Sequence, residues 1–335
     1  MRIGLHIGPL QEFPPVDQFM EFVRRAEDMG FDPLLFADTV SLSHFRVLDP
    51  FPIMTMATQV TKTATLGTCV TNPVTRHLSV TANAFATIDH IAGGRTVLGI
   101  GSGDTALYLL GKKAMNLAMM RRTLQVLRGL LDGKPVIYED QELRSNWDKP
   151  NLPIFLAADG PKTLALGGEL ADGVIVGAGL SREVIDWVRA RVHEEGIRTD
   201  RQTGSPPLWV DGIVNFGEDR EAVRNATRPR MCTRTNHNFR VAYHPVPEEH
   251  LEEVKNFREN YNESDVGYRS KNTERVTDYL IDRFGIVGTK SDVIGRFEEI
   301  GDQGVETFLV AIPFILKERF RIIDMLAKEV IPRLS

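Results

Sequence analysis

Three side chains that could move protons stand at the ends of predicted β-strands. His6 ends one strand-like segment, and Asp38 and Asp104 each follow another. A carboxyl group beside an apolar ligand can have a raised pKa and act as an acid, and histidine titrates near neutral pH. Each residue alone also has an ordinary role, a solvated loop carboxylate for the aspartates and a hydrogen-bonded imidazole for His6. Together they are the candidate catalytic groups.

Two glycine-containing turns have the composition of loops whose backbone contacts a ligand. Gly101-Ser102-Gly103-Asp104 closes a strand-like run, and glycine there lets the backbone approach a flat or anionic ligand closely. The run lacks the last glycine of the dinucleotide fingerprint, so an ordinary turn is the alternative. The second turn, Asp159–Thr163, places Pro161 at the start of a predicted helix whose free N–H groups would bind a phosphate. Its alternative is that Asp159 only caps the helix.

The elements that would position these residues alternate regularly between strand and helix. Eight strands are predicted, at residues 2–7, 33–37, about 64–69, about 95–100, 153–158, 173–176, 208–216 and 306–312. This number predicts a (β/α)8 TIM barrel, in which functional groups lie at the carboxyl ends of the strands. An open doubly wound sheet is the competing architecture. We expect a single domain over residues 1–335, with insertions at about 134–150 (a surface excursion such as a small hairpin) and about 227–272.

Composition excludes several classes of function. The 335 residues carry 40 Lys and Arg against 45 Asp and Glu, a net charge of -5, and neither sign forms a long block. Nucleic acid and anionic membranes are therefore not expected as partners. The two cysteines form no CxxC pattern, so neither a disulfide nor a metal site is expected. A strand-like segment follows Met1 directly, and no apolar run approaches the ~18 residues that span a bilayer, so we expect a cytoplasmic protein.

Several segments, in their order and spacing, resemble the bacterial luciferase-like family of flavin and deazaflavin oxidoreductases. They are Val70–His77, Gly99–Asp104, Gly160–Leu164, Ala171–Ile175 and Gly288–Thr289. The likeness is strongest to the methylenetetrahydromethanopterin reductase branch. It implies a luciferase-like barrel, usually a homodimer. It also implies a redox cofactor whose three-ring system lies at the strand ends. That cofactor is coenzyme F-420 (F420), an 8-hydroxy-5-deazaflavin, with FMN as the alternative.

The resemblance also implies which residues hold the cofactor. A non-prolyl cis peptide at Cys69–Val70 would support one face of the ring, and Asp104 would lie near its pyrimidine edge. The turns at Gly160–Thr163 and Gly177-Ala178 would hold the phosphate side of the tail. The implied cofactor-binding set is Asp38, Cys69, Val70, Thr71, Asn72, Gly101, Ser102, Gly103, Asp104, Ala158, Asp159, Gly160, Pro161, Thr163, Gly177 and Ala178, and the candidate catalytic set is Asp104, His6 and Asp38.

Two departures from the family pattern leave the substrate open. His6 stands where the methanopterin reductases carry an acidic residue, and Thr39 stands where the related sugar-phosphate dehydrogenases carry a histidine. We therefore expect hydride transfer between F420 and an unassigned small organic molecule. An FMN-dependent monooxygenase that uses dioxygen is the alternative, and a barrel that binds a ligand without turnover is a second one.

Polar and aromatic residues near the predicted mouth have open roles. Arg76, His77 and His44 would serve the substrate or only begin a helix. The insertion at 227–272 would form a lid over the substrate or contribute to dimer contacts. Its candidate lid residues are His237, Phe239, Tyr243 and His244.

Overall fold

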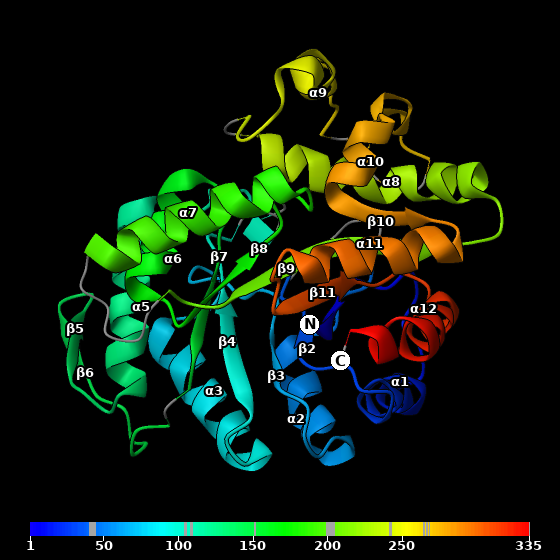
Figure 1. The fold of residues 1–335 in the computed structure, drawn as a ribbon. Coiled ribbons are helices and arrows are strands. Elements are labelled where there is room, and N and C mark those ends of the chain that lie inside the picture. The colour runs from blue at the N-terminus through cyan, green and yellow to red at the C-terminus, as the bar shows by residue number, and fades with distance from the viewer. Residues whose placement is uncertain are drawn as a thin grey trace.

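The computed structural model describes residues 1–39, 45–103, 106–107, 110–150, 152–198, 205–240, 243–263, 265, 267 and 269–334. Within these residues, eight parallel strands close into a barrel, seen in Figure 1. They are β1 (Arg2–Ile7), β2 (Leu34–Phe36), β3 (Leu66–Thr68), β4 (Thr96–Ile100), β7 (Ile154–Ala157), β8 (Gly173–Val176), β9 (Leu208–Phe216) and β11 (Thr307–Ala311). Closure is complete because β9 pairs with both β8 and β11, and β11 pairs with β1. The predicted (β/α)8 barrel is confirmed, and the open sheet is excluded.

The strands are apolar on both faces because helices cover the outside and side chains fill the inside. A separate cluster of buried residues occupies the barrel interior, among them Leu35, Val97, Phe155, Trp209 and Leu309. Large rings fit there because neighbouring positions are small. A Cβ on Gly173 would lie 2.1 Å from a ring carbon of Phe155. The interior below the mouth is therefore a packed core, as is usual for this architecture.

Helices between the strands cover the outside of the barrel (Figure 1). They are α1 (Val16–Asp28), α2 (Pro50–Val60), α3 (Leu78–Ala92), α5 (Leu117–Leu131), α6 (Pro161–Leu170), α7 (Arg182–Arg198), α11 (Lys290–Asp302) and α12 (Leu316–Glu329). The face of α1 with Phe19, Phe22, Val23 and Ala26 is buried, as its spacing predicts. Among the helices that the structure describes, none combines the length and apolarity needed to cross a bilayer.

Two excursions leave the barrel. The first contains the antiparallel pair β5 (Val136–Tyr138) and β6 (Gln141–Leu143), the small hairpin expected at 134–150. The second lies between β9 and α11 and contains α8 (Arg220–Phe239), η1 (Glu248–His250), α9 (Leu251–Glu259), η2 (Lys271–Arg275), α10 (Asp278–Phe284) and β10 (Gly285–Gly288). This inserted unit starts before the predicted boundary at residue 227, because α8 already begins at Arg220.

The inserted unit has a hydrophobic core of its own. Met231 and Phe239 of α8 pack with Phe257 of α9 and Leu280 of α10, and all four are buried. Its strand β10 extends the barrel sheet by pairing with the second half of β9. Figure 1 shows the unit above the barrel, on the side of β9 and β10. Because it carries a core, the unit is a rigid platform that can hold side chains against the mouth.

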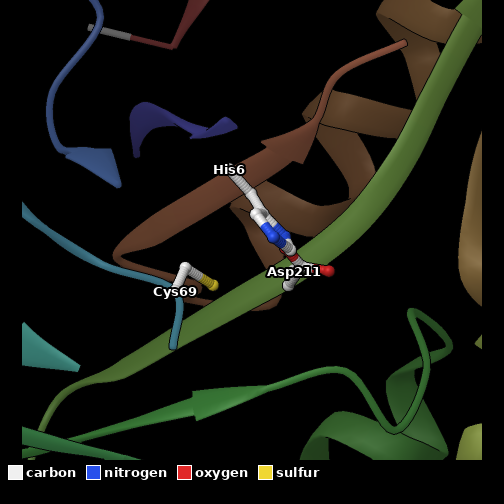
Figure 2. Close-up of side chains that lie close together, drawn as sticks. All are labelled: His6, Cys69 and Asp211. Carbon is white, nitrogen blue, oxygen red and sulfur yellow. The ribbon is translucent and has the colours of Figure 1, made fainter. Parts of the chain in front are cut away.

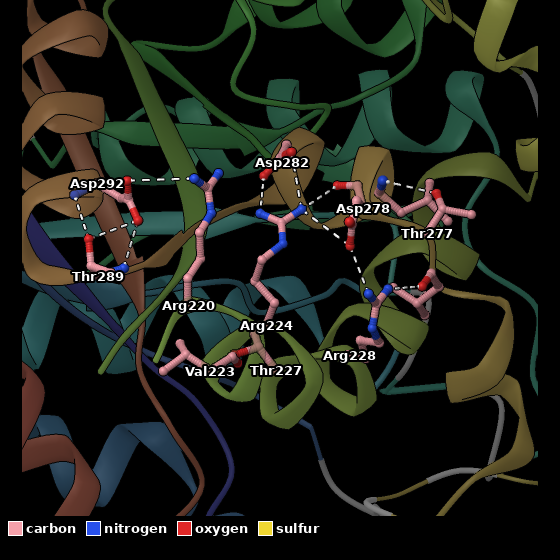
Figure 3. A network of polar contacts seen from close by, with 12 residues as sticks. Arg220, Val223, Arg224, Thr227, Arg228, Thr277, Asp278, Asp282, Thr289 and Asp292 are labelled. Atoms are coloured by element: carbon pink, nitrogen blue, oxygen red, sulfur yellow. Dashed lines mark hydrogen bonds and ion pairs between the residues drawn. The ribbon is translucent and has the colours of Figure 1, made fainter. Parts of the chain in front are cut away.

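Arginines on one face of α8 attach that helix to α10 and α11, as Figure 3 shows. The buried Arg224 donates to Asp282 at 2.6 Å, and Arg228 donates to Asp278 at 2.7 Å. The hydrogen bond that Arg224 donates to Asp282 raises the pKa of Arg224 above its usual value. Burial acts to raise the pKa of Asp278, but the bonds and charges of Arg228 and Arg224 lower it overall. This network fixes how the inserted unit sits on the helices beside it.

Helix α11 begins with a capping box that should make stability depend on pH. The Thr289 N–H donates to the Asp292 carboxylate at 2.8 Å, and the Asp292 N–H donates to the Thr289 hydroxyl at 3.3 Å. Hydrogen bonds from Thr289 lower the pKa of Asp292 below its usual 3.8. A carboxyl whose pKa is lower in the folded state stabilises the fold above the unfolded pKa, and this contribution disappears as the pH falls through the folded pKa.

We therefore predict that Asp292→Asn lowers the free energy of unfolding by about 0.5–1 kcal/mol at pH 7. The difference from the wild type should shrink below pH 4 and disappear at the lowest pH at which the protein still folds. Urea unfolding at a series of pH values measures it. The exposed Asp186 of α7, replaced by Asn, is the matched control and should change stability by less than about 0.5 kcal/mol. A loss in Asp292→Asn that does not vary with pH would contradict the prediction.

Candidate active site

The carboxyl ends of the parallel strands bring most of the predicted site residues to one mouth. His6 lies in β1, Asp38 follows β2, Cys69 follows β3, Gly101 follows β4 and Gly177 follows β8. Parallel strands end on the same side of a barrel, so these positions surround one opening. Asp104 and His44, two of the predicted residues, lie outside the described part of the chain.

The centre of the mouth is an ion pair that strand-end reasoning did not predict. His6 Nδ1 lies 2.7 Å from Asp211 Oδ2, and Asp211 Oδ1 pairs with the guanidinium of Arg234. Figure 2 shows the imidazole of His6 directed at Asp211, with the Cys69 sulfur on the same side. Only 4% of the Asp211 side chain is exposed, against 23% of His6. A buried carboxylate is thus shared between β1 and a helix of the inserted unit.

Strand register explains how His6 reaches Asp211 across an intervening strand. Strand β11 lies between β1 and β9, and pairs His6 with Ala311 and Asp211 with Leu309. Leu309 points into the barrel, so Ala311, two residues later, points to the same side. The small methyl group of Ala311 leaves the space in which the imidazole and the carboxylate meet.

The charges around His6, Cys69 and Asp211 do not favour the binding of a metal ion. His6, Cys69 and Asp211 each offer a ligand atom, and these atoms lie within 4.8 Å of one another. Burial lowers the pKa of Arg234, which the charge of Asp159 opposes, but an arginine stays protonated in proteins. Its guanidinium already occupies one oxygen of Asp211 and places a positive charge against the cluster. The arrangement suits a proton-carrying imidazole better than a metal ion.

The loop after β3 is held to the loop after β2 through Asp38. The Cys69–Val70 peptide bond is cis, as the family resemblance implied. Two residues later, the buried Thr71 donates its hydroxyl proton to Asp38 at 2.6 Å, and Arg76 donates to the same oxygen at 2.6 Å. Burial raises the pKa of Asp38, while the bonds from Thr71 and Arg76 oppose the shift. Asp38 is therefore a buried and bonded carboxylate.

The two basic residues that follow have local roles. Besides its bond to Asp38, Arg76 donates a second hydrogen bond to Asp49 at 2.7 Å, so it joins the two aspartates. His77 is the N-cap of α3, and its Nδ1 accepts from the Ser79 N–H at 3.3 Å. The sequence left open whether these residues serve the substrate or only begin a helix. His77 begins a helix, whereas Arg76 holds the two loops together.

The corner between β3 and β4 has the features of a site for a flat, polar ligand. The side-chain oxygen of Asn72, Oδ1, accepts from the Val74 N–H and the Thr75 N–H, at 3.0 Å each. Its amide nitrogen is buried and has no hydrogen-bond partner among the described residues, so it is a donor available to a ligand. Opposite it, Gly101 has no room for a side chain, because a Cβ would lie 2.9 Å from Val70. The resemblance to flavin and deazaflavin enzymes makes this corner the candidate position for the cofactor ring.

The turn expected to bind phosphate follows β7, the strand that pairs with β4. Gly160 is the N-cap of α6, and no side chain described here caps that helix. Asp159 instead accepts from the Gly177 N–H at 2.6 Å, so the alternative in which it only caps α6 is wrong. Asn238 of α8 donates to the Gly177 carbonyl at 3.0 Å. The free first turn of α6 therefore stays available to an anion.

The predicted lid residues divide between core and surface. Phe239 is buried in the core of the inserted unit, so it does not face a substrate. Tyr243 packs beside it, with ring centroids 6.3 Å apart. His244 stacks on Trp187 of α7, which connects the inserted unit to the barrel.

Sequence reasoning missed Asp211, Arg234 and Asn238. Asp211 did carry a signal, since it is a charged residue in the middle of the apolar run Leu208–Phe216. A charge at such a position is rarely buried without a partner. Arg234 and Asn238 had no comparable signal, because they lie in a polar helix far along the chain from the residues that they contact.

The fold is a parallel barrel whose carboxyl end gathers most of the candidate site residues. The comparisons with known proteins agree. The sequence profile of the family described as luciferase-like monooxygenase matches residues 2–307. The chain therefore belongs to the luciferase-like monooxygenase family.

Two curated relatives give the range of similarity within the family. The 5,10-methylenetetrahydromethanopterin reductase of Archaeoglobus fulgidus is 31% identical over the whole of both chains. The F420-dependent glucose-6-phosphate dehydrogenase of Beutenbergia cavernae is 28% identical, over 68% of this chain and 72% of its own.

Solved structures with the same fold cover the whole chain. The coenzyme F420-dependent tetrahydromethanopterin reductase of Methanopyrus kandleri superposes with a TM-score of 0.79 at 22% identity, over all of both chains. An F420-dependent secondary alcohol dehydrogenase, solved with an F420-acetone adduct, gives a TM-score of 0.76 at 18% identity over all of this chain and 99% of its own. At these identities the likeness concerns the fold.

The packing around Gly103 gives a test of the corner. Its φ is +85°, and an added Cβ would lie 2.8 Å from Leu107 and 2.9 Å from the Asn72 Cβ. We predict that Gly103→Ala lowers the free energy of unfolding by about 2–4 kcal/mol, from backbone strain and overpacking together.

Gly111 is the matched control, because its φ of +66° is similar and no described atom lies within 4 Å of an added Cβ. Gly111→Ala should cost only about 1 kcal/mol. Urea unfolding of both variants separates strain from crowding. Equal losses would show that the corner is more open than the structure indicates.

Proposed function

We propose that this protein is an oxidoreductase that transfers hydride between coenzyme F420 and a small organic substrate at the barrel mouth. The observation that carries the proposal is the corner itself. It combines the unpartnered amide of Asn72 and the tightly packed Gly101 with His6 at the same barrel mouth. The curated relatives support the same cofactor, since they include F420-dependent enzymes.

The residues that would hold F420 follow from the site. Thr71, Asn72, Gly101 and Gly103 would lie beside its ring. The first turn of α6 and the turn at Gly177-Ala178 would hold its phosphate. When bound, a deazaflavin supplies two-electron hydride chemistry. The protein would supply orientation, exclusion of water and a proton partner for the substrate.

We assign the proton chemistry to this chain's own titratable residues. Asp104 is expected near the pyrimidine edge of the ring from the family resemblance. Asp38 already accepts bonds from Thr71 and Arg76, which limits its exchange of protons. His6 is the partly exposed group of the mouth, and its Nδ1 is fixed by Asp211.

The alternative is an FMN-dependent monooxygenase. Two observations favour this alternative. The family is described as luciferase-like monooxygenase. A monooxygenase from Streptomyces bottropensis has the same fold, with a TM-score of 0.71 at 17% identity over all of both chains. Sequence similarity favours F420, because the curated relatives include an F420-dependent glucose-6-phosphate dehydrogenase that is 28% identical over 68% of this chain. A barrel that binds a ligand without turnover is the second alternative. A homodimer and a cytoplasmic location remain predictions.

Cofactor choice decides between the two redox chemistries. We predict that the purified protein binds F420 with a micromolar or lower Kd, measured by the change in deazaflavin fluorescence, and binds FMN at least about 10-fold more weakly. Gly101→Ala should weaken F420 binding, because its methyl group would displace Val70 from the ring side of the corner. Gly295→Ala on α11, where an added Cβ meets no described atom within 4 Å, is the control. Tight FMN retention with no response to F420 would favour the monooxygenase.

The role of Asp104 is tested separately. If it acts as a general acid, Asp104→Asn should lower kcat by about 10²-fold and leave the Kd for F420 within a few-fold of the wild type. Asp186→Asn, on the outer surface of α7, should leave both unchanged. An unchanged kcat in Asp104→Asn would remove this residue from the catalytic set.

A further inference from the structure

A buried carboxylate at the mouth is bound on both sides by groups from distant segments. Asp211 of β9 contacts His6 Nδ1 at 2.7 Å through Oδ2, and pairs with Arg234 of α8 through Oδ1. Each oxygen therefore faces one of these two groups, Oδ2 as a hydrogen-bond partner of His6 and Oδ1 as the charge partner of Arg234, and only 4% of the side chain is exposed. Such an arrangement controls where protons sit on the neighbouring imidazole.

We propose that Asp211 and Arg234 are positioning residues that hold His6 as its Nδ1–H tautomer, so that Nε2 exchanges the proton with the substrate. The catalytic meaning of this proposal rests on the proposed function. The tautomer itself is a property of the protein without cofactor.

Donor and acceptor capacity fixes the tautomer. The permanent positive charge of Arg234 in contact with Oδ1 favours the ionised form of Asp211. An ionised carboxylate only accepts, so the hydrogen between Asp211 and His6 must belong to Nδ1. In the neutral imidazole this leaves the lone pair on Nε2. The same logic applies wherever a carboxylate orients a catalytic histidine.

The surroundings of Nε2 leave it accessible. The atom lies 4.0 Å from the position that a Cβ on Gly8 would occupy, so the residue beside it in the loop after β1 carries no side chain. Asp211 and the buried Cys69 lie beside the ring, and Arg234 lies behind Asp211, in contact with its other oxygen. His6 keeps 23% of its side chain exposed, whereas its two partners are more deeply buried. The free nitrogen is thus on the open side of the cluster.

This arrangement indicates the class of substrate. When a carbon loses hydride to the deazaflavin, the O–H or N–H bond on that carbon must release its proton. The electrons of that bond stay on the heteroatom and form the second bond to carbon. Nε2 takes the proton, and returns it when the reaction runs in reverse. The site therefore suits a substrate with a CH–OH or CH–NH group, interconverted with C=O or C=N.

Nitrogen NMR of the cofactor-free protein tests the tautomer directly. The chain has 8 histidines, so ¹⁵N-histidine labelling gives few signals, and His6→Gln identifies the His6 pair by its absence. At a pH where the imidazoles are neutral, the wild type should show a protonated Nδ1 and an unprotonated Nε2 for His6. A protonated Nε2 in the wild type overturns the proposal.

Substitution of the carboxylate should reverse the tautomer. In Asp211→Asn, Arg234 must still donate, so the amide oxygen turns to it and the NH2 group faces His6. Nδ1 must then accept, and the proton moves to Nε2. Arg234→Lys keeps a donor and a charge and should preserve the wild-type tautomer. Asp89→Asn replaces a buried carboxylate that bonds to Thr96 at the start of β4, and it should not alter the His6 signals.

Kinetics with F420 then separate this proposal from the proposed function. Asp211→Asn should lower kcat by about 10²-fold or more, with the Kd for F420 within a few-fold of the wild type. If the protein does not bind F420 but His6 shows the Nδ1–H tautomer, the proposed function fails and the positioning role stands. If Asp211→Asn leaves the tautomer and kcat unchanged, the positioning role fails alone.

Discussion

A carboxylate enclosed in a parallel barrel must be paired, and Asp211 satisfies this constraint with groups from two distant segments. One partner, His6, comes from the first strand, and the other, Arg234, comes from a helix more than 200 residues later, in the inserted unit. A buried ion pair adds little net stability, because desolvation offsets most of the attraction, but removing one partner is costly. The pairing therefore specifies how the mouth is assembled. It makes the inserted unit part of the active site.

The inserted unit can perform this task because it is rigid. Its own core, with Met231 and Phe257 fully buried, holds α8 in place, and the arginine network to α10 and α11 fixes the helix from its other face. Arg234 and Asn238 lie near the end of α8 and reach the mouth from this support. A flexible loop in the same position would lose the entropy of ordering a long arginine side chain each time the site formed.

The sequence predicted the barrel well because its elements obey local rules. Buried parallel strands such as Thr96–Ile100 read as short apolar runs, and helices such as Pro161–Leu170 have clear starts and ends. The inserted unit does not obey such rules. Helix α8 is polar, contains Pro229 and is stabilised mainly by contacts with α10 and β10, which are far along the chain. Strand β10 has four residues and begins and ends with glycine, so its pairing with β9 depends on the tertiary fold.

The same distinction applies to the site. The rule that function lies at strand ends identified His6, Asp38 and Gly101, because chain order alone decides which residues follow a strand. Asp211 lies within β9, four residues into a nine-residue strand, so a rule about ends overlooks it. The role of Asp159 also depended on the fold. Its carboxylate accepts from the Gly177 N–H, in the loop after the neighbouring strand β8, and does not cap the helix α6 that follows it in the chain.

These contacts also suggest why His6 stands where the methanopterin reductases carry an acid. The buried Asp38 accepts bonds from Thr71 and Arg76, so the carboxylate closest to the β3 loop is committed to holding the mouth together. The position at the end of β1 lies across β11 from Asp211, and an acidic residue there would face a second carboxylate. An imidazole turns this repulsion into a hydrogen bond and keeps one nitrogen free. The residue at the end of β1 and the residue in the middle of β9 therefore constrain each other, and a change at one requires a compensating change at the other.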